Sequence, residues 1–249
     1  MKSKAVAVVP TYNERDNIKS VVDCLLSSSG DVDVLVVDDN SPDGTGKFAD
    51  ELAKKHAEVN VLHRKKKDGL GRAYCDGFSW ALERSYEFML EMDGDFSHDP
   101  KDIPKFLEAA QEADLVIGSR YRDGIRVINW PLNRLVLSLC AAKYVQIITG
   151  MPFTDPTGGF KCFRRSALEI IDLDRVRSNG YSFQIELTHQ VWRRGLKVSE
   201  VPIIFTDRFQ GSSKMSPAII REALVIVWQL WFRNGFRRKP STNSGSILT

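Results

Sequence analysis

Short apolar runs alternate along the chain with segments of helical periodicity, and this alternation limits the folds that the chain can adopt. We predict strands at residues 5–10, 33–39, 59–64, 88–95 and 114–120. We predict helices at residues 16–28, 44–57, 71–85 and 100–113. Strands that are apolar on both faces and alternate with amphipathic helices are typical of a mostly parallel sheet covered by helices on both faces. The sequence therefore predicts an α/β fold of this kind.

The composition argues against a nucleic-acid partner and against a membrane-spanning chain. A net charge of +3 over 249 residues gives no basic field of the kind that nucleic-acid-binding proteins show. No segment reaches the roughly 18 uncharged apolar residues of a transmembrane helix, and the apolar stretch at residues 5–10 is too short for a signal peptide. The four cysteines are scattered without CxxC spacing, which favours structural thiols in a reducing compartment. We expect a soluble or peripheral protein.

Polar clusters follow all five predicted strands. They are PTYNE (10–14), DDNSPDGTG (38–46), RKKKDGLG (64–71), DGD (93–95) and GSRY (118–121). Because ligands of such sheets bind beyond the carboxyl ends of the strands, these clusters predict a site along one edge of the sheet. The alternative, that loops are polar anyway, explains one such cluster more readily than five.

Two acidic pairs indicate the chemistry of this site. Asp93 and Asp95 flank a glycine at a strand end, where two carboxylates can share one Mg²⁺ whose other ligands are phosphate oxygens and water. Asp38 and Asp39 end another strand, where a carboxylate can accept hydrogen bonds from a base or ribose. Asp43 can instead cap the helix that follows it, and both roles are compatible.

Two other phosphate-binding patterns are incomplete. The stretch GTGK lacks the spacing of a P-loop, and Phe48 stands where that motif needs serine or threonine. The stretch GLG is followed by Tyr74 where the dinucleotide fingerprint needs its third glycine. A nicotinamide-dependent enzyme is therefore not supported.

The motifs, taken together and in order, resemble the polyprenol-phosphate (dolichol-phosphate) mannosyltransferases of glycosyltransferase family 2. The resemblance extends from Ala5 to Ala223. It implies a GT-A type fold and an inverting transfer of mannose from GDP-mannose to a polyprenyl phosphate. The motifs that carry it are VVPTYNE, VVDDNSPDGTG, GLGRAY, EMDGDFSHDP, IGSRY, NWPLNR, DPTGGFKCFRR, GYSFQIEL and GSSKM.

The same resemblance implies roles for individual residues. Those implied to line the nucleotide and sugar pocket are Pro10, Tyr12, Glu14, Val37, Asp39 and Gly94. Asp93 and Asp95 are implied to hold Mg²⁺ or Mn²⁺ as the cofactor, and Ser97 matches a third metal-side position where some members have glutamine. Arg120, Arg208 and Lys214 are implied to face phosphates, and Arg134 is implied to face the phosphate of the acceptor. The implied catalytic residues are Asp95, Arg120, Arg208 and Lys214.

Two further side chains have open roles. His98 follows the acidic motif and either approaches the metal or is a polar loop histidine. Glu186 either lies near the sugar or is an acid on the surface of a helix. The proposed chemistry needs no general base, because a phosphate monoester is already an anion at pH 7. It needs cations that hold this anion beside an anionic donor.

The C-terminal part of the chain predicts a membrane contact. We expect residues 1–217 to form the catalytic domain, 218–239 an amphipathic helix at the membrane interface, and 240–249 a disordered tail. In the helix, Trp228, Trp231, Phe232 and Phe236 stand beside Arg233, Arg237, Arg238 and Lys239, which suits a membrane interface. The alternative is a helix packed on the sheet with a solvated basic end. The expected location is the cytoplasmic face of a membrane, peripherally bound, with a membrane-anchoring protein as a possible partner.

Two other functions stay open at this point. One is the transfer of glucose or another sugar from a UDP donor to the same lipid phosphate. The other is a catalytically silent nucleotide-binding subunit, against which the intact pair of Asp93 and Asp95 argues. Selectivity between GDP and UDP, with and without Mg²⁺, separates the donors.

Overall fold

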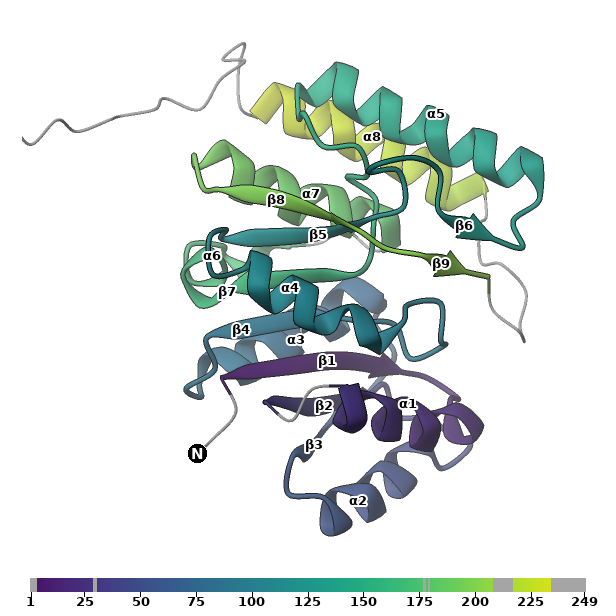
Figure 1. The fold of residues 1–249 in the computed structure, drawn as a ribbon, viewed down its shortest axis with the longest axis vertical. Helices are drawn as coiled ribbons and strands as arrows, with labels where there is room; N and C mark the ends of the chain where they lie inside the picture. The colour runs from purple at the N-terminus through teal and green to yellow at the C-terminus, as the bar shows by residue number, and fades with distance from the viewer. Residues whose placement is uncertain (1–3, 29–30, 177, 179, 208–216, 234–249) are drawn as a thin grey trace, which may run out of the picture.

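The computed structural model describes residues 4–28, 31–176, 178, 180–207 and 217–233; the side chains of 217–223 and 233 are not described. Its main sheet has seven strands in the order β3-β2-β1-β4-β7-β5-β8 (Figure 1). The pairings are parallel except at β7, which is antiparallel to both β4 and β5. The strands are β1 (Ala5–Thr11), β2 (Val32–Asp38), β3 (Val59–His63), β4 (Phe88–Glu91), β5 (Leu115–Ser119), β7 (Lys161–Arg164) and β8 (Val198–Pro202).

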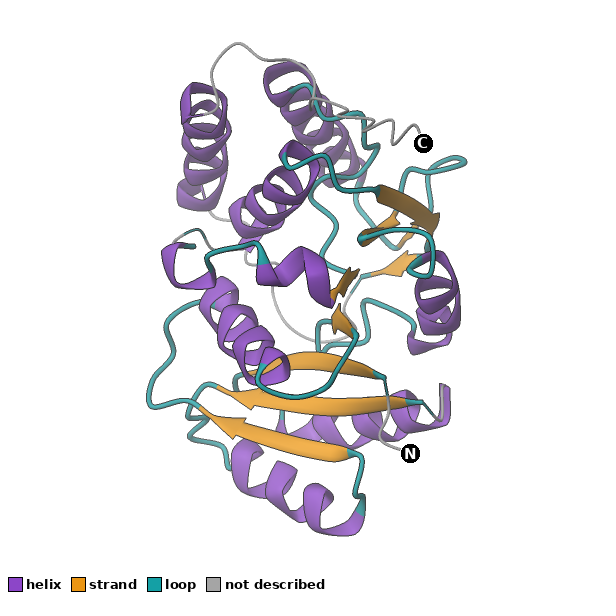
Figure 2. Ribbon diagram, turned by 90° about the vertical axis from the view of Figure 1, so that its left-hand side faces the viewer, coloured by secondary structure: helices purple, strands orange, loops and turns teal. Residues whose placement is uncertain are grey.

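Helices cover both faces of this sheet (Figure 2). They are α1 (Arg15–Ser28), α2 (Thr45–Lys55), α3 (Leu70–Leu82), α4 (Ile103–Ala109), α5 (Leu132–Thr149), α6 (Arg165–Glu169), α7 (Gly180–Arg193) and α8 (Pro217–Arg233). Short 3₁₀ turns, η1 (Pro100–Asp102) and η2 (Leu173–Arg175), and a small parallel pair, β6 (Val127–Ile128) with β9 (Phe205–Thr206), complete the described elements. The mostly parallel α/β sheet is confirmed.

Each face of the sheet has its own core, because side chains alternate along a strand. In β1, Val6 and Val8 pack with residues of α3, α6 and α7. Ala7 and Val9 point the other way and pack with residues of α1, α2 and α4. This double burial explains why the strands read as continuous apolar runs in the sequence.

The first 120 residues fold closely as predicted, whereas the second half contains elements that the sequence patterns did not predict. These are β6, β7, β8, β9, α5, α6 and α7. Strand β7 is only four residues long, and it separates β4 from β5 in the sheet. The five predicted strands are therefore not five direct neighbours.

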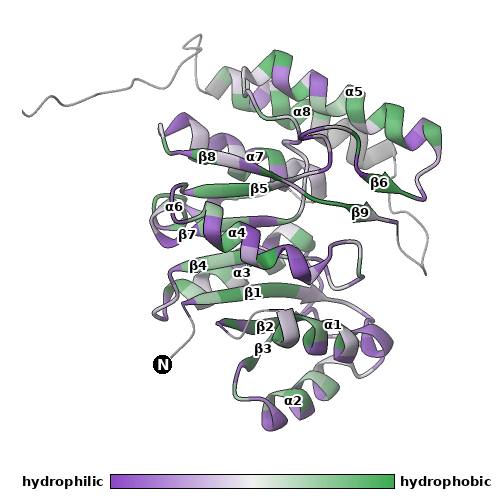
Figure 3. Ribbon diagram, viewed as in Figure 1, coloured by the Kyte–Doolittle hydropathy of each residue, from purple (hydrophilic) through white to green (hydrophobic). Residues whose placement is uncertain are grey.

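Helices α5 and α8 lie side by side beyond the β8 edge of the sheet (Figure 1). Val227 and Leu230 of α8 are buried in the core shared with α3 and α7. Other apolar side chains of the pair are exposed, and Figure 3 shows this apolar character along both helices. The exposed ones are Leu132, Val136, Leu137 and Ile147 of α5 and Leu224, Val225, Trp228 and Phe232 of α8. No described helix is long and apolar enough to span a membrane.

Candidate active site

A polar cavity of about 420 Å³ opens at the carboxyl edge of the sheet. It brings together most of the residues that the resemblance implies. Those that line it are Pro10, Tyr12, Glu14, Asp39, Asp93, Gly94, Asp95, Arg120 and Arg134. Arg208 and Lys214 lie outside the described residues, so their predicted roles stay predictions.

Val37 does not line the cavity, and the prediction that it does is corrected. Its side chain is completely buried in the core on the α3 side of the sheet. A Cβ atom on Gly77 of α3 would lie 3.2 Å from Val37 Cγ2, so the strand and helix pack too closely there for any ligand. Asp39 is only two positions away but has a different environment, because Val37 lies within β2 whereas Asp39 follows the last residue of that strand.

The acidic stretch after β2 divides its carboxylates between two tasks. Asp38 Oδ1 and Oδ2 accept hydrogen bonds from the hydroxyl (2.6 Å) and backbone N–H (3.1 Å) of Ser41, and so shape the turn. Asp39 lines the cavity and pairs with Arg64, whose Nε also donates to Asp76 at 2.7 Å. Burial raises the pKa of the Asp39 carboxyl, and the Arg64 guanidinium opposes this rise. Of the two carboxylates, Asp39 is therefore the one that lines the cavity.

Asp43 is not the N-cap of α2, which is Gly44, but its side chain binds the first residue of the helix. Its Oδ1 accepts from the backbone N–H of Thr45 at 3.0 Å and from the Thr45 hydroxyl at 2.6 Å. Burial alone would raise the pKa of Asp43, but the hydrogen bonds from Thr45 and Arg15 lower it overall. A Cβ on Gly46 would lie 2.6 Å from Asp38 Oδ2, so a larger residue there would displace the Asp38 carboxylate. The turn-forming residues of this stretch thus fold the chain around the buried Asp38.

Asp93 and Asp95 are held by hydrogen bonds at the edge of the cavity. The Tyr74 hydroxyl donates to Asp93 Oδ1 at 3.1 Å, and the Ser97 hydroxyl and N–H donate to Asp95 Oδ1 at 2.6 and 3.1 Å. Burial, with these carboxylates nearby, raises the pKa of Tyr74 well above its usual value, so it stays a neutral donor. The structure gives the buried Ser97 hydroxyl a positioning role on Asp95.

The donor set at this acidic pair fits a hard divalent cation. Within the described ranges, no group of three or more histidine, cysteine or acidic side chains is arranged to hold a metal. The two carboxylates would therefore supply two ligands, and substrate phosphate and water the rest, which is how Mg²⁺ is commonly bound. His98 lines the cavity but packs between Phe160 and Phe205, with ring centroids 5.1 and 5.3 Å away. At 3% exposure it is not the polar loop histidine of the second expectation, and it lies in the wall of the cavity that contains Asp93 and Asp95.

Arg120 lies in the cavity wall and is fixed by a carboxylate that sequence reasoning missed. Its Nε and Nη2 atoms each donate to the buried Asp155 at 2.6 Å, and Nη2 also donates to Thr157 at 2.9 Å. Burial would raise the pKa of Asp155, but the Arg120 guanidinium holds it below its usual value. The sequence contained one indication of this role. Asp155 opens the DPTGGF motif, and no helix follows that it could cap. Arg120 thus reaches the cavity in one fixed orientation.

Arg134 lies in the first turn of α5 and lines two cavities. Its Nη1 donates to Asp207 at 2.7 Å, and its guanidinium lies 4.2 Å from the centre of the Trp130 ring. It lines the polar cavity and also a second, apolar cavity of about 270 Å³ between α5, α7 and α8. Thr157 and Tyr181 are likewise shared by both linings.

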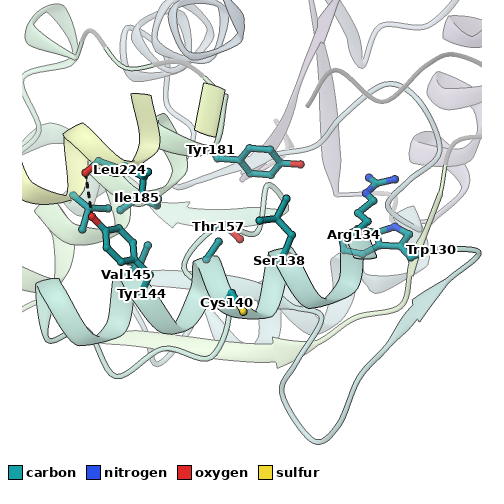
Figure 4. Close-up of a pocket in the computed structure, with 13 residues that line it drawn as sticks. Trp130, Arg134, Ser138, Cys140, Tyr144, Val145, Thr157, Tyr181, Ile185 and Leu224 are labelled. Atoms are coloured by element: carbon teal, nitrogen blue, oxygen red, sulfur yellow. Dashed lines mark hydrogen bonds between the residues drawn. The ribbon is translucent and has the colours of Figure 1, made fainter. Parts of the chain in front are cut away.

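The apolar cavity extends from Arg134 along α5. Figure 4 shows Arg134 and Trp130 beside each other at one end, and Tyr144, Val145 and Leu224 at the other. The remaining lining is almost entirely apolar or small, and consists of Leu137, Ser138, Cys140, Ala141, Thr157, Tyr181, Ile185 and Val227. Such a lining suits a hydrocarbon chain whose anionic head group lies at the guanidinium of Arg134.

A buried charged pair beneath the polar cavity was also missed. Glu91 of β4 stands opposite Lys161 of β7 in the strand register, and both are completely buried. Burial raises the pKa of Glu91 to about 7 and lowers that of Lys161 to about 8. Lys161 Nζ donates to the backbone oxygen and the Oε1 of Gln184 at 2.8 and 2.7 Å, and Gln184 lines the cavity. Lys161 thus holds an amide side chain at the cavity wall.

Glu186 fits neither of its two predicted places. It is 5% exposed, so it is no surface acid, and it does not line the polar cavity. Its carboxylate accepts hydrogen bonds from the Ser178 hydroxyl and, at 3.3 Å, from Gln190. It ties the start of α7 to the segment before it.

Comparison with known proteins shows the family of this chain. Residues 6–171 match the family described as glycosyl transferase family 2. The chain is 46% identical over 224 residues to an undecaprenyl-phosphate mannosyltransferase of Micrococcus luteus, covering 90% of this chain and 92% of the relative. It is 47% identical over 237 residues to a polyprenol monophosphomannose synthase of Mycolicibacterium smegmatis, covering 94% and 89%.

The fold is shared with solved structures of lower sequence identity. One is a glucosyl-3-phosphoglycerate synthase from Mycobacterium tuberculosis, solved with Mn²⁺, UDP and glucosyl-3-phosphoglycerate. It superimposes with a TM-score of 0.67 at 18% identity, over 92% of this chain and 80% of that one. This likeness extends to the sheet and its helices, and it confirms the expected GT-A type architecture.

Proposed function

Because the chain belongs to glycosyl transferase family 2, we propose that it transfers mannose from GDP-mannose to the phosphate of a polyprenyl lipid. Two relatives with 46% and 47% identity over most of the chain carry names for this kind of transfer, which supports the lipid phosphate as acceptor. The product would be a polyprenyl-phosphate mannose, used in glycan assembly.

The observation that carries the proposal is the junction of two unlike cavities. A polar cavity lined by carboxylates meets an apolar one along α5, and Arg134 belongs to both linings. A lipid phosphate has these same two parts, an anionic head and a hydrocarbon tail. With its head at Arg134, its tail would follow α5 and its phosphate would face the donor sugar.

On the donor side, the nucleotide would lie at the carboxyl ends of β1 and β2. Asp39 would accept hydrogen bonds from the guanine or ribose, with Pro10, Tyr12 and Glu14 around it. Asp93 and Asp95 would hold Mg²⁺ or Mn²⁺, which supplies positive charge to the leaving diphosphate. The structurally similar synthase was solved with Mn²⁺ and UDP, in keeping with divalent metal use in this fold.

On the acceptor side, the chemistry needs cations and no base. The acceptor phosphate oxygen would form the new bond to the anomeric carbon as the bond to the diphosphate breaks, with inversion to the β-anomer. At pH 7 this phosphate is already deprotonated. Arg134 and Arg120 would hold it, with Arg208 and Lys214 as further cations from the undescribed segment.

The lipid acceptor also requires contact with a membrane. We place this contact at α5 and α8, whose exposed apolar side chains include Leu132, Val136, Trp228 and Phe232. The protein would act peripherally at the cytoplasmic face of a membrane, alone or with an anchoring protein partner.

A donor screen with a short polyprenyl phosphate tests the function. GDP-mannose, UDP-glucose and UDP-N-acetylglucosamine are offered with Mg²⁺ or Mn²⁺, and products are detected by mass spectrometry. We expect the mannosylated lipid phosphate from GDP-mannose, and no product from the corresponding polyprenol. If only a UDP-sugar gives a product, that UDP-sugar is the donor in place of GDP-mannose. Nucleotide binding without any product would indicate a catalytically silent subunit.

A further inference from the structure

Arg134 lies at the junction of the two cavities and Arg120 in the wall of the polar one, and their carboxylate partners differ in accessibility. Asp155 is completely buried and binds Arg120 through two contacts of 2.6 Å. Asp207 has a side chain that is 30% exposed, and it contacts Arg134, itself 18% exposed, at 2.7 Å. The Arg134–Asp207 pair is only partly buried, so solvent reaches it, and ion pairs that solvent reaches are weaker than fully buried ones. A competing anion can therefore replace Asp207, whereas Asp155 is out of reach.

The aromatic surroundings hold Arg134 independently of its anion. Its guanidinium lies over Trp130, 4.2 Å from the ring centre. Trp130 in turn packs edge-on against Phe205 of β9, with ring centroids 5.4 Å apart. A guanidinium stacked on a fixed ring keeps its orientation when one anion leaves and another arrives.

We propose that, in the ligand-free protein, Asp207 occupies the place on Arg134 that the acceptor phosphate takes, and thereby selects for lipids with a doubly charged headgroup. This inference rests on the proposed function. Arginine binds carboxylate and phosphate with the same forked geometry. A phosphate monoester carries a charge of about −1.5 to −2 at pH 7, more than a carboxylate, so it displaces Asp207. A lipid alcohol or a weakly charged head does not.

The inference predicts a gain of affinity, which a purely structural role of Asp207 would not produce. Binding of farnesyl phosphate is measured by isothermal titration calorimetry for the wild type and for Asp207→Asn. We expect the variant to bind at least about threefold more tightly, because the neutral amide competes less for Arg134. Farnesol, which lacks the phosphate, is expected to show no such gain. In an Arg134→Ala background the gain is expected to vanish, because the two changes act on one contact.

A matched control separates this effect from net charge. Asp23 pairs with Lys19 on the exposed face of α1, so Asp23→Asn removes the same charge far from the cavities and should leave binding unchanged. If Asp207→Asn is poorly folded by thermal unfolding, Asp207→Ser takes its place with the same expected sign. Equal or weaker binding by the folded variant overturns the inference alone. A wild type that binds GDP but no farnesyl phosphate overturns the proposed function as well.

Discussion

Asp95 is the residue whose charge we expect to matter most. Asp95→Asn keeps the shape and the hydrogen bonds from Ser97 but removes an anionic metal ligand. Mannosyl transfer is expected to fall by roughly two orders of magnitude or more, together with the affinity for Mn²⁺. Asp99→Asn is the control, since Asp99 is exposed and only caps η1, a task that asparagine performs equally well. If the Asp95 variant turns over at the wild-type rate with Mg²⁺ restored, the assignment of the metal to Asp93 and Asp95 is wrong.

Arg134 should distinguish the two substrates. Arg134→Ala removes the forked cation at the entrance of the apolar cavity, so the KM for polyprenyl phosphate is expected to rise about tenfold or more. The KM for GDP-mannose should change far less, because Asp39 and Tyr12 lie elsewhere in the polar cavity. Steady-state kinetics with each substrate varied separately measure this difference. An equal rise in both KM values would indicate that Arg134 acts on the donor and not specifically on the acceptor.

Asp155 should matter for stability as well as for activity. Asp155→Asn leaves the buried guanidinium of Arg120 without its counter-charge, which is expected to cost about 3–5 kcal/mol of unfolding free energy. Asp172→Asn is the control, because its pair with Arg175 is exposed and should contribute at most about 1 kcal/mol. Urea unfolding of both variants compares them. Similar losses would mean that burial of the Arg120 pair is unimportant.

At the residue scale, the sequence predicted the groups that face the ligand better than the groups that support them. Asp39, Asp93 and Asp95 stand directly after strands, so their position follows from the topology of a parallel sheet. Asp155 and Glu91 act through partners 35 and 70 positions away along the chain, Arg120 and Lys161. No local pattern encodes such pairings, because they depend on which strands become neighbours.

At the scale of elements, a buried histidine in α7 links folding to pH. His189 is 2% exposed, and burial, with the nearby Arg193, lowers its pKa to about 4. Between pH 6.5 and 4 the unfolded chain takes up a proton that the folded protein excludes, so stability is lost as the pH falls through this window. At pH 4.5 this amounts to roughly 2 kcal/mol.

His189→Gln should remove this part of the acid sensitivity. Urea unfolding at pH 7 and pH 4.5 gives the loss of stability for each protein. We expect the variant to lose about 2 kcal/mol less than the wild type over this range. Equal losses would show that His189 is protonated in the folded protein at pH 4.5.

The elements that the sequence missed share a physical cause. Strands β6 and β9 have two residues each and β7 has four, too few to show a period-2 pattern. In helix α7, polar side chains such as Gln184, Glu186 and His189 are buried together with the apolar ones, so no separate polar face marks its period. The first half of the chain was predictable because its strands are longer and its helices are amphipathic.

At the scale of the whole molecule, the exposed apolar face of α5 and α8 predicts membrane binding. Glutamates at Val136 and Trp228, which are 50% and 43% exposed, should abolish sedimentation with anionic liposomes without unfolding the protein. Ile170→Glu is the matched control, since Ile170 is 41% exposed beside α6. High salt should weaken the wild-type binding through the bases after Phe232. Binding that the double variant retains would assign the membrane contact to another surface or to a partner.

The position of β7 has a consequence for how the chain is made. Strand β7 lies between β4 and β5, yet it begins at Lys161, long after β5 ends at Ser119. As synthesis proceeds from the N-terminus, β4 has an open edge and β5 has no neighbour until the later strands emerge. Open apolar edges pair readily with other chains, and contacts between distant segments form slowly. The interval between the synthesis of β5 and that of β7 is therefore when the nascent chain is most exposed to aggregation.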